Sequence, residues 1–232
     1  MKLKHILEDF PKIRKKRVKR LPQQHKYFRV NEPSVLRNKK VSHLGSGSFA
    51  SVYAHEDRPH DVRRISRPSA DPDAYQAYIE ALENNPDYDN PYFPQIHEVT
   101  TYQGRAPATV ISVKAGRLRE LHELRTEEIQ AVLERWFGED YEKVLAKVYP
   151  IGGPGFRGED SISYYIVPDL VRRLIETKKL RKMIVDQELL RAINFMDEKV
   201  LKKGVQSDLG INNLMFRRSP SGIQIVITDP VA

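Results

Sequence analysis

The 232-residue sequence predicts an α+β fold in which a strand-rich first half with one helix precedes a mainly helical second half. Two observations support this prediction. Short apolar runs at strand spacing, separated by glycine and proline turns, extend from about residue 41 to residue 113. After Thr126 the apolar residues recur at helical spacing instead. A hydrophobic share of 40% is enough to build a core, so disorder throughout the chain is excluded.

The expected strand-rich lobe spans residues 35–115, and each of its elements follows from local pattern. Apolar alternation on both sides of a glycine turn gives the first hairpin, and alanines, tyrosines and a leucine at helical spacing give the helix, for which Asp71 or Asp73 is the expected cap. The expected elements are two strands within 41–54, a short strand near Val62 after a turn at 57–60, a helix over 73–83, and strands over 94–102 and 108–113.

The expected helical lobe spans residues 116–232. Thr126 can cap a helix running to about Tyr149, with Glu127 and Glu128 in the first turn, where the helix dipole favours negative charge. Two further helices are expected around 167–178 and 183–202, and a hairpin of two strands, 213–216 and 223–227, closes the chain.

The positive charge of the protein is concentrated in an N-terminal arm, residues 1–34. The net charge is +8, yet residues 1–40 hold 14 Lys and Arg against 3 acidic residues, whereas the remainder holds 25 against 28. The densest block is residues 12–20, between Pro11 and Pro22. Such a block commonly stays solvated. It can also serve as an electrostatic handle for nucleic acid or an acidic protein surface.

Composition excludes several classes of protein. The sequence has no cysteine, which rules out disulfides, thiolate metal sites and cysteine nucleophiles. No run approaches the roughly 18 apolar residues that a membrane span requires. Lys2, Lys4 and Asp9 interrupt the stretch where a signal peptide would be apolar. We therefore expect a soluble, cytoplasmic protein with no membrane partner.

Gly45, Ser46, Gly47 and Ser48 lie between the first two expected strands. Small residues at such a turn let backbone N–H groups approach a phosphate chain. An ordinary glycine hairpin explains the same residues when they are taken alone.

Asp208 and Asn213 lie in a polar loop between an expected helix and a strand, and Asp229 follows the apolar strand 223–227. An acid and an amide five residues apart on one loop can face the same cleft, and a carboxylate at the end of an apolar strand requires an explanation. Singly, each could be a turn residue. Together with the glycine turn they match phosphoryl transfer, in which a glycine loop covers the triphosphate, Mg²⁺ neutralises it, and a carboxylate aligns the attacking hydroxyl.

At these residues the sequence resembles the protein-kinase-like fold. Residues 44–53, Leu-Gly-Ser-Gly-Ser-Phe-Ala-Ser-Val-Tyr, look like the nucleotide-covering loop, and residues 208–216 look like the catalytic loop. Residues 227–231, Ile-Thr-Asp-Pro-Val, stand where the family has its Asp-Phe-Gly metal motif. The early glycine motif and the Ile-Thr-Asp-Pro ending are similar to the early serine/threonine kinases of T-seven-type short-tailed bacteriophages.

The resemblance implies a two-lobe fold, with residues 35–115 as the N-lobe, and an ATP- and Mg²⁺-dependent serine/threonine protein kinase. The substrates of such a kinase would be host proteins, with the transcription machinery among the candidates, and the kinase itself. It would act in the host cytoplasm. The implied roles are phosphate binding by Gly45, Ser46, Gly47 and Ser48, adenine contact by Val52 and the hinge Val113–Gly116, orientation of the substrate hydroxyl by Asp208, and Mg²⁺ binding by Asn213 and Asp229.

Several positions depart from the family pattern. The third-strand lysine falls at Arg64, which is not equivalent to lysine in a tight phosphate site and therefore affects turnover more than binding. Its helix partner would be Glu80 or Glu83, which lie three residues apart on one face of the helix, with Glu80 slightly preferred. Smaller departures are Ala50 for the third loop glycine, Gln206-Ser207 for His-Arg, and Pro230-Val231 for Phe-Gly, and residues 120–160 are expected to form an insertion.

The sequence ends three residues after Asp229, which predicts a truncated C-lobe without an activation segment. Either substrate is then held by other surfaces, such as the inserted helices and the basic arm, or the fold is a nucleotide-binding remnant. Three other functions remain open: a pseudokinase binding module that inhibits a host protein by occupancy, a small-molecule phosphotransferase, and a nucleic-acid-binding regulator. The last leaves Asp208, Asn213 and Asp229 unexplained.

Overall fold

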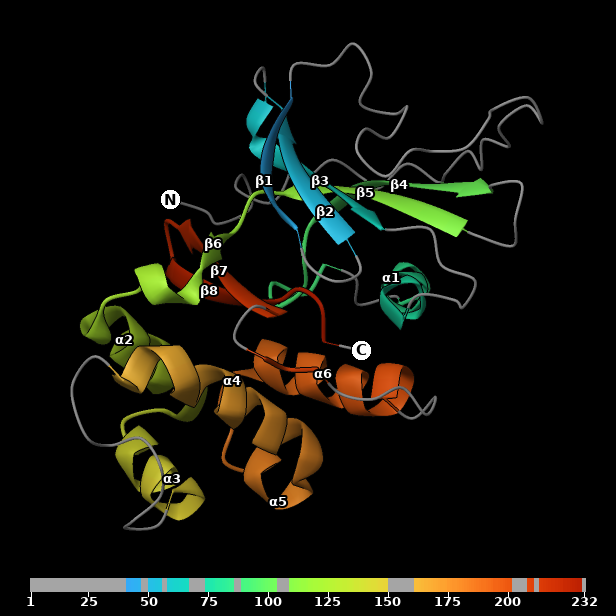
Figure 1. Cartoon of the computed structure of the whole chain (residues 1–232). Coiled ribbons are helices and arrows are strands. Elements are labelled where there is room, and N and C mark those ends of the chain that lie inside the picture. The colour runs from blue at the N-terminus through green and yellow to red at the C-terminus, as the bar shows by residue number, and fades with distance from the viewer. Residues whose placement is uncertain are drawn as a thin grey trace, which may run out of the picture. The chain divides into compact units, whose positions relative to one another are not determined.

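The computed structural model describes residues 41–46, 50–55, 58–66, 74–85, 89–103, 109–149, 161–201, 208–210 and 213–230. These residues form an α+β fold with two antiparallel sheets and several helices (Figure 1), as the sequence predicts. The described residues within Met1–Asp71 and Gln95–Gly116 make one compact unit, and those within Pro72–Pro94 and Arg117–Ala232 make a second. Among all described residues, no helix is both long enough and apolar enough to cross a membrane.

The first unit is a five-stranded antiparallel sheet with the strand order β1-β2-β3-β5-β4. Its strands are β1 Val41–Ser46, β2 Ala50–His55, β3 Arg58–Ser66, β4 Ile96–Gln103 and β5 Thr109–Gly116. All five strands were expected. The turn predicted at 57–60 is wrong, because Arg58 already pairs with His55 and β3 begins there. A register shift between His43 and Gly45 gives β1 an irregularity. Gly45 and Ser46, expected between the first two strands, are instead the last residues of β1, because they pair with Val52 and Ser51.

The helix expected over 73–83 is present as α1, Ala74–Glu83, and it lies within the second unit. Its expected caps Asp71 and Asp73 lie outside the described residues. Tyr78, Ile79 and Leu82 are fully buried, which gives the helix one apolar face at helical spacing. That face packs within the second unit, and α1 contacts the π-helical turn η4, Met196–Val200. The sequence prediction instead assigns this helix to the strand-rich lobe, residues 35–115.

The remaining helices of the second unit differ from the prediction mainly at their ends. They are η3 Leu121–Glu123, α2 Thr126–Phe137, α3 Tyr141–Val148, α4 Ser161–Glu176, α5 Lys178–Arg181 and α6 Gln187–Phe195. The single helix expected from Thr126 to Tyr149 is wrong. Gly138 ends α2 with φ of 74°, a conformation that favours glycine, and its N–H donates to the Glu134 carbonyl at 2.7 Å.

Two helix starts also correct the prediction. Arg125, rather than Thr126, is the N-cap of α2, and the Glu128 carboxylate accepts a hydrogen bond from the Arg125 N–H at 3.0 Å. The helix expected from residue 183 begins at Gln187, because Asp186 caps α6. The Asp186 Oδ1 atom accepts hydrogen bonds from the backbone N–H groups of the second and third helical residues at 2.9 and 3.0 Å.

The second sheet has the strand order β6-β7-β8 and closes the chain as expected. Its strands are β6 Arg119–Glu120, β7 Leu214–Ser219 and β8 Gly222–Ile227. β7 and β8 form a hairpin whose register runs from Ser219 opposite Gly222 to Leu214 opposite Ile227. The buried side chains of this sheet lie in the core of the unit with α2, which contacts β8. β6 is too short to be found from its own pattern.

Candidate functional site

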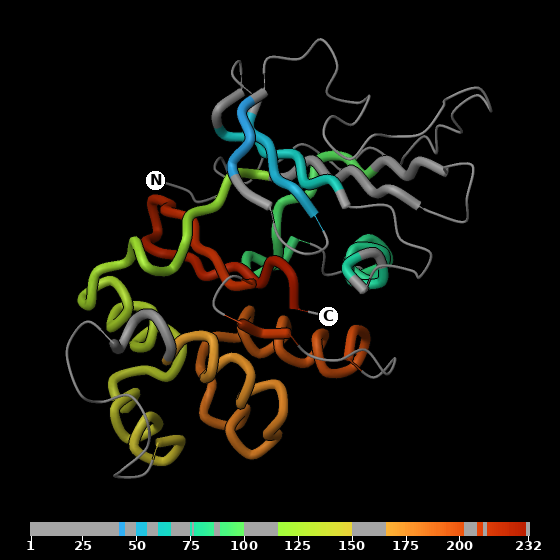
Figure 2. The backbone as a smooth tube through the Cα atoms, in the orientation of Figure 1, coloured from blue at the N-terminus to red at the C-terminus, as the bar shows by residue number. Residues whose placement is uncertain are grey.

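The β7–β8 hairpin brings the predicted polar residues of the second unit together. Asn213 precedes β7 and Asp229 follows β8, and the pairing of Leu214 with Ile227 makes these two ends neighbours. The Asn213 carbonyl oxygen accepts hydrogen bonds from the backbone N–H of Thr228 at 2.9 Å and of Asp229 at 3.4 Å. Figure 2 shows the backbone of the β7–β8 hairpin in red, near the C-terminal end of the chain.

Asp208 is held in the same cluster by two hydrogen bonds. Its backbone N–H donates to the Pro230 carbonyl oxygen at 2.9 Å, and its carbonyl oxygen accepts from Nδ2 of Asn213 at 2.5 Å. The Asn213 N–H in turn donates to Gly210 at 3.1 Å, which folds the loop back on itself. Asp208 is exposed, whereas Asn213 and Asp229 are half-buried. The three residues therefore form one hydrogen-bonded cluster, which we call the Asp208–Asn213–Asp229 cluster.

The side-chain oxygen atoms of this cluster are of the kind that binds magnesium together with phosphate. Because Nδ2 of Asn213 donates to the Asp208 carbonyl, the amide oxygen is directed away from that contact. The Oδ1 atom of Asp229 is buried and accepts no hydrogen bond from the described residues, although Asp229 takes part in other interactions. Magnesium is usually bound by one or two carboxylate or amide oxygens together with water and substrate phosphates. No group of three His, Asp or Glu side chains forms a metal cage in the described part of the chain.

Two tyrosines hold the end of β8 immediately before the cluster. The Tyr78 hydroxyl, on α1, donates to the carbonyl oxygen of Ile227 at 2.7 Å. The N–H of Ile227 donates to the carbonyl oxygen of Tyr92 at 2.8 Å. Both polar groups of this buried residue are thus satisfied by segments that lie far away in the sequence.

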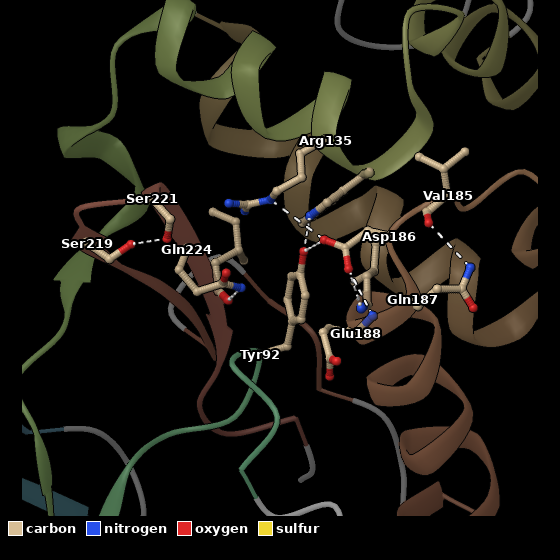
Figure 3. Close-up of polar contacts among 12 residues, drawn as sticks. Tyr92, Arg135, Val185, Asp186, Gln187, Glu188, Ser219, Ser221 and Gln224 are labelled. Carbon is tan, nitrogen blue, oxygen red and sulfur yellow. Dashed lines mark hydrogen bonds and ion pairs between the residues drawn. The ribbon is translucent and has the colours of Figure 1, made fainter. Parts of the chain in front are cut away.

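The side chain of Tyr92 is itself anchored in a buried polar network (Figure 3). Its hydroxyl donates to Oδ2 of Asp186 at 2.5 Å and accepts from Nε1 of Trp136 at 2.8 Å. Nε of Arg135 lies 3.7 Å from the same Asp186 oxygen. Burial and the hydrogen bond to Asp186 raise the pKa of Tyr92 well above its ordinary value.

In the first unit, cross-strand pairing aligns three of the predicted nucleotide-binding residues. Gly45 lies opposite Val52, Val52 opposite Arg64, and Arg64 opposite Val113, so the four positions form one row across β1, β2, β3 and β5. Residues directly opposite each other in an antiparallel ladder present their side chains on the same face. Val52 and Arg64 therefore share one face of the sheet.

Strand geometry also separates Arg64 from its neighbour Arg63. Successive side chains of a strand point to opposite faces. Arg63 forms an ion pair with Glu98 on β4, with Nη2 and Oε2 3.4 Å apart. Arg64, which the sequence identifies as the phosphate-binding candidate, lies on the face of Val52 instead. The structure thus places Arg63 and Arg64 on opposite faces of the sheet, and the role of Arg64 stays a prediction.

The other predicted site residues are distributed over both units. Ser46 pairs with Ser51 at the end of β1, and Val113–Gly116 are the last residues of β5, where the Gly116 N–H donates to the Gln95 carbonyl at 3.0 Å. Glu80 is an exposed residue of α1 in the second unit. Gly47, Ser48 and the basic block 12–20 lie outside the described residues.

Sequence reasoning missed the residues that hold the cluster in place. Thr228 donates its hydroxyl to the Asn213 carbonyl at 2.9 Å, and Tyr78 fixes the preceding carbonyl. A hydroxyl residue between an apolar strand and Asp229 was a usable indication for Thr228. No local pattern marks Tyr78, because its partner lies 149 residues away.

Comparison with known proteins adds no assignment. No family model matches the chain, and no curated protein matches its sequence.

Proposed function

We propose that this protein is an ATP- and Mg²⁺-dependent serine/threonine protein kinase with a kinase-like two-lobe arrangement. The observation that carries the proposal is the hydrogen-bonded Asp208–Asn213–Asp229 cluster, which unites a loop acid, a loop amide and a strand-end acid. Phosphoryl transfer needs this combination, because positioning and charge neutralisation supply most of its catalysis. We propose host proteins as substrates, and the host cytoplasm as the place of action.

The order of the motifs along the chain supports the same proposal. Gly45 and Ser46 end β1, Arg64 lies on β3, Asp208 and Asn213 precede β7, and Asp229 follows β8. This order agrees with the resemblance to kinases that the sequence carries. The row formed by Gly45, Val52 and Arg64 adds a second group of residues suited to a nucleotide.

In the proposed reaction each residue has one role. Asp208 would orient the substrate hydroxyl and accept its proton as the oxygen attacks the γ-phosphorus of ATP, and ADP would leave. Asn213 and Asp229 would hold Mg²⁺, which when bound neutralises charge on the phosphates. Gly45, Ser46, Gly47 and Ser48, together with Arg64, would bind the phosphate chain, and Val52 would pack against the adenine.

A second candidate function is a pseudokinase that binds a host protein without turnover. The observation that favours it is Arg64, since a branched guanidinium cannot replace the lysine ammonium as a compact charge. In that case the basic block 12–20 would act as the handle for an acidic partner surface or nucleic acid.

Thermal unfolding with ATP, with and without Mg²⁺, tests nucleotide binding. We expect a stabilisation that depends on Mg²⁺ and is lost in Asp229→Ala. Asp89→Ala, which removes an exposed carboxylate from the same unit, is the matched control and should keep it. A wild-type protein without any Mg²⁺-dependent shift contradicts the proposal.

Transfer of labelled phosphate from ATP to host extract separates the two candidates. The kinase predicts labelling that Asp208→Ala removes while the Mg²⁺-dependent stabilisation is retained. Binding without labelling, together with full activity of Asp208→Ala and loss of activity on deletion of residues 1–34 in cells, favours the pseudokinase.

A further inference from the structure

We infer that Tyr78 is a positioning residue for Asp229, and that its hydroxyl fixes the peptide group from which the Mg²⁺-binding end of the site continues. The inference rests on the proposed function, because it concerns the same cluster. Tyr78 contributes no ligand atom to the cluster itself. Its effect is exerted through the backbone of β8.

The geometry concerns a single peptide group, the one between Ile227 and Thr228. Its C=O accepts from the Tyr78 hydroxyl at 2.7 Å, and its N–H donates to the Asn213 carbonyl at 2.9 Å. A peptide group is planar and rigid, so fixing both ends fixes the orientation of the whole plane. The next residue but one after Ile227 is Asp229. The direction in which the chain enters Asp229 is therefore set by α1 on one side and by the catalytic-loop residue Asn213 on the other.

Burial makes this contact difficult to replace. Ile227 is 1% exposed and Tyr78 is fully buried, so water has little access to the carbonyl oxygen. A buried carbonyl that loses its donor is expected to turn toward another one. Because the peptide plane is rigid, such a rotation also turns the Thr228 N–H away from Asn213. Loss of one hydroxyl is thus expected to disturb both proposed metal-binding residues.

A purely structural role for Tyr78 is the alternative, and the chain offers a matched control for it. Tyr149 is the C-cap of α3 in the same unit and donates its hydroxyl to Oδ2 of Asp169 on α4 at 2.8 Å. Tyr149→Phe removes the hydroxyl that bonds to Asp169, just as Tyr78→Phe removes the hydroxyl that bonds to Ile227. The ring of Tyr149 also lies beneath the guanidinium of Arg173, 5.1 Å from its centroid. Arg173 and Asp169 both belong to α4 rather than to the Asp208–Asn213–Asp229 cluster.

The test is a Mg²⁺ titration of thermal stabilisation at a fixed concentration of a non-hydrolysable ATP analogue, in wild type, Tyr78→Phe and Tyr149→Phe. Both variants are expected to unfold at lower temperature than wild type without ligand. Only Tyr78→Phe is expected to raise the Mg²⁺ midpoint, by about fivefold, the factor that corresponds to losing one net hydrogen bond. The shift in unfolding temperature that the analogue causes without Mg²⁺ should differ from that of wild type by the same amount in the two variants.

Amide hydrogen exchange gives a second measurement that needs neither nucleotide nor metal. At a low temperature where all three proteins are folded, Tyr78→Phe is expected to speed exchange at Thr228 and Asp229, whereas Tyr149→Phe leaves these amides unchanged. Unchanged exchange, or equal Mg²⁺ midpoints in Tyr78→Phe and wild type, overturns the inference alone. A wild-type protein without Mg²⁺-dependent stabilisation overturns the proposed function and this inference with it.

Discussion

The Thr228 hydroxyl donates a hydrogen bond to the carbonyl oxygen of Asn213 at 2.9 Å, beside a second bond of the same length from the Thr228 N–H. One acceptor therefore binds both the side chain and the backbone of the residue before Asp229. This double contact links the loop that carries Asn213 to the end of β8.

Thr228→Val should separate the hydroxyl from the side-chain shape. Valine keeps the branched side chain and loses the donor, so we expect a loss of about 1 kcal/mol in the free energy of unfolding. We also expect a higher Mg²⁺ midpoint in the stabilisation assay. Thr228→Ser keeps the hydroxyl and should retain the wild-type midpoint. Equal midpoints in the valine variant and wild type would contradict a role for the hydroxyl.

The predicted members of the cluster were accessible from sequence because each is locally unusual. Asp208 and Asn213 are polar residues in a short loop after a core helix, and Asp229 ends an apolar strand. Their supports were not accessible in this way. Tyr78 and Tyr92 read as ordinary aromatic residues, and only the three-dimensional pairing of α1 and residues 89–94 with β8 reveals their contacts.

Arg181→Ala should be among the more destabilising single substitutions in the second unit. Arg181 is 8% exposed, donates to the carbonyl oxygens of Leu174 and Ile175, and lies 2.9 Å from Oδ2 of Asp197. Removing it leaves the last turn of α4 and a partly buried carboxylate without their donor. We expect a loss of about 3 kcal/mol in urea unfolding.

The control for Arg181 is Arg191→Ala. Arg191 forms an exposed ion pair with Glu188 on α6, a kind of pair that contributes about 0.5 kcal/mol or less. If the two alanine variants lose equal stability, the assignment of Arg181 as the buried cap of α4 is wrong.

The course of the helices shows where sequence patterns failed. Apolar periodicity alone predicted one helix over residues 126–149, because it does not reveal that Gly138 adopts a positive φ. It also extended the helix at 183 across Asp186, whose side chain satisfies the first N–H groups of α6. Most expected strands were right, since alternation and turn residues specify them locally.

Acid should weaken the contact between α2 and β7. Arg218 donates two hydrogen bonds to Glu128, and this contact lowers the pKa of Glu128 to about 2 from an ordinary value of 4.5. A carboxyl whose pKa is lower in the folded state stabilises the fold above its unfolded pKa, and this contribution disappears as pH falls through the folded pKa. The stability difference between wild type and Glu128→Gln should therefore be largest near neutral pH and shrink from about pH 5 toward pH 2.

Glu127→Gln is the control for this pH dependence. Glu127 is an exposed residue of the same first turn, so it experiences the same helix dipole without the Arg218 contact. Its stability difference from wild type should be smaller. Chemical unfolding at a series of pH values measures both variants, and equal pH profiles would contradict the ion-pair explanation.

Tyr92→Phe should destabilise the second unit while sparing the candidate site more than Tyr78→Phe does. The substitution removes the donor to Asp186 and leaves the Trp136 N–H, on a fully buried ring, without its acceptor. We expect a loss of about 2 to 4 kcal/mol. Trp136 is the only tryptophan, so its fluorescence follows unfolding of this unit directly.

Tyr141→Phe on α3 is the matched control, and it should stay within about 0.5 kcal/mol of wild type. The site contact of Tyr92 is made by its backbone carbonyl, which Tyr92→Phe retains, whereas that of Tyr78 is made by the hydroxyl that Tyr78→Phe removes. Tyr92→Phe should therefore lower the free energy of unfolding while leaving the Mg²⁺ midpoint nearly unchanged. A midpoint that rises as much in Tyr92→Phe as in Tyr78→Phe would mean that metal binding follows the overall stability of the unit rather than the orientation of the peptide before Asp229.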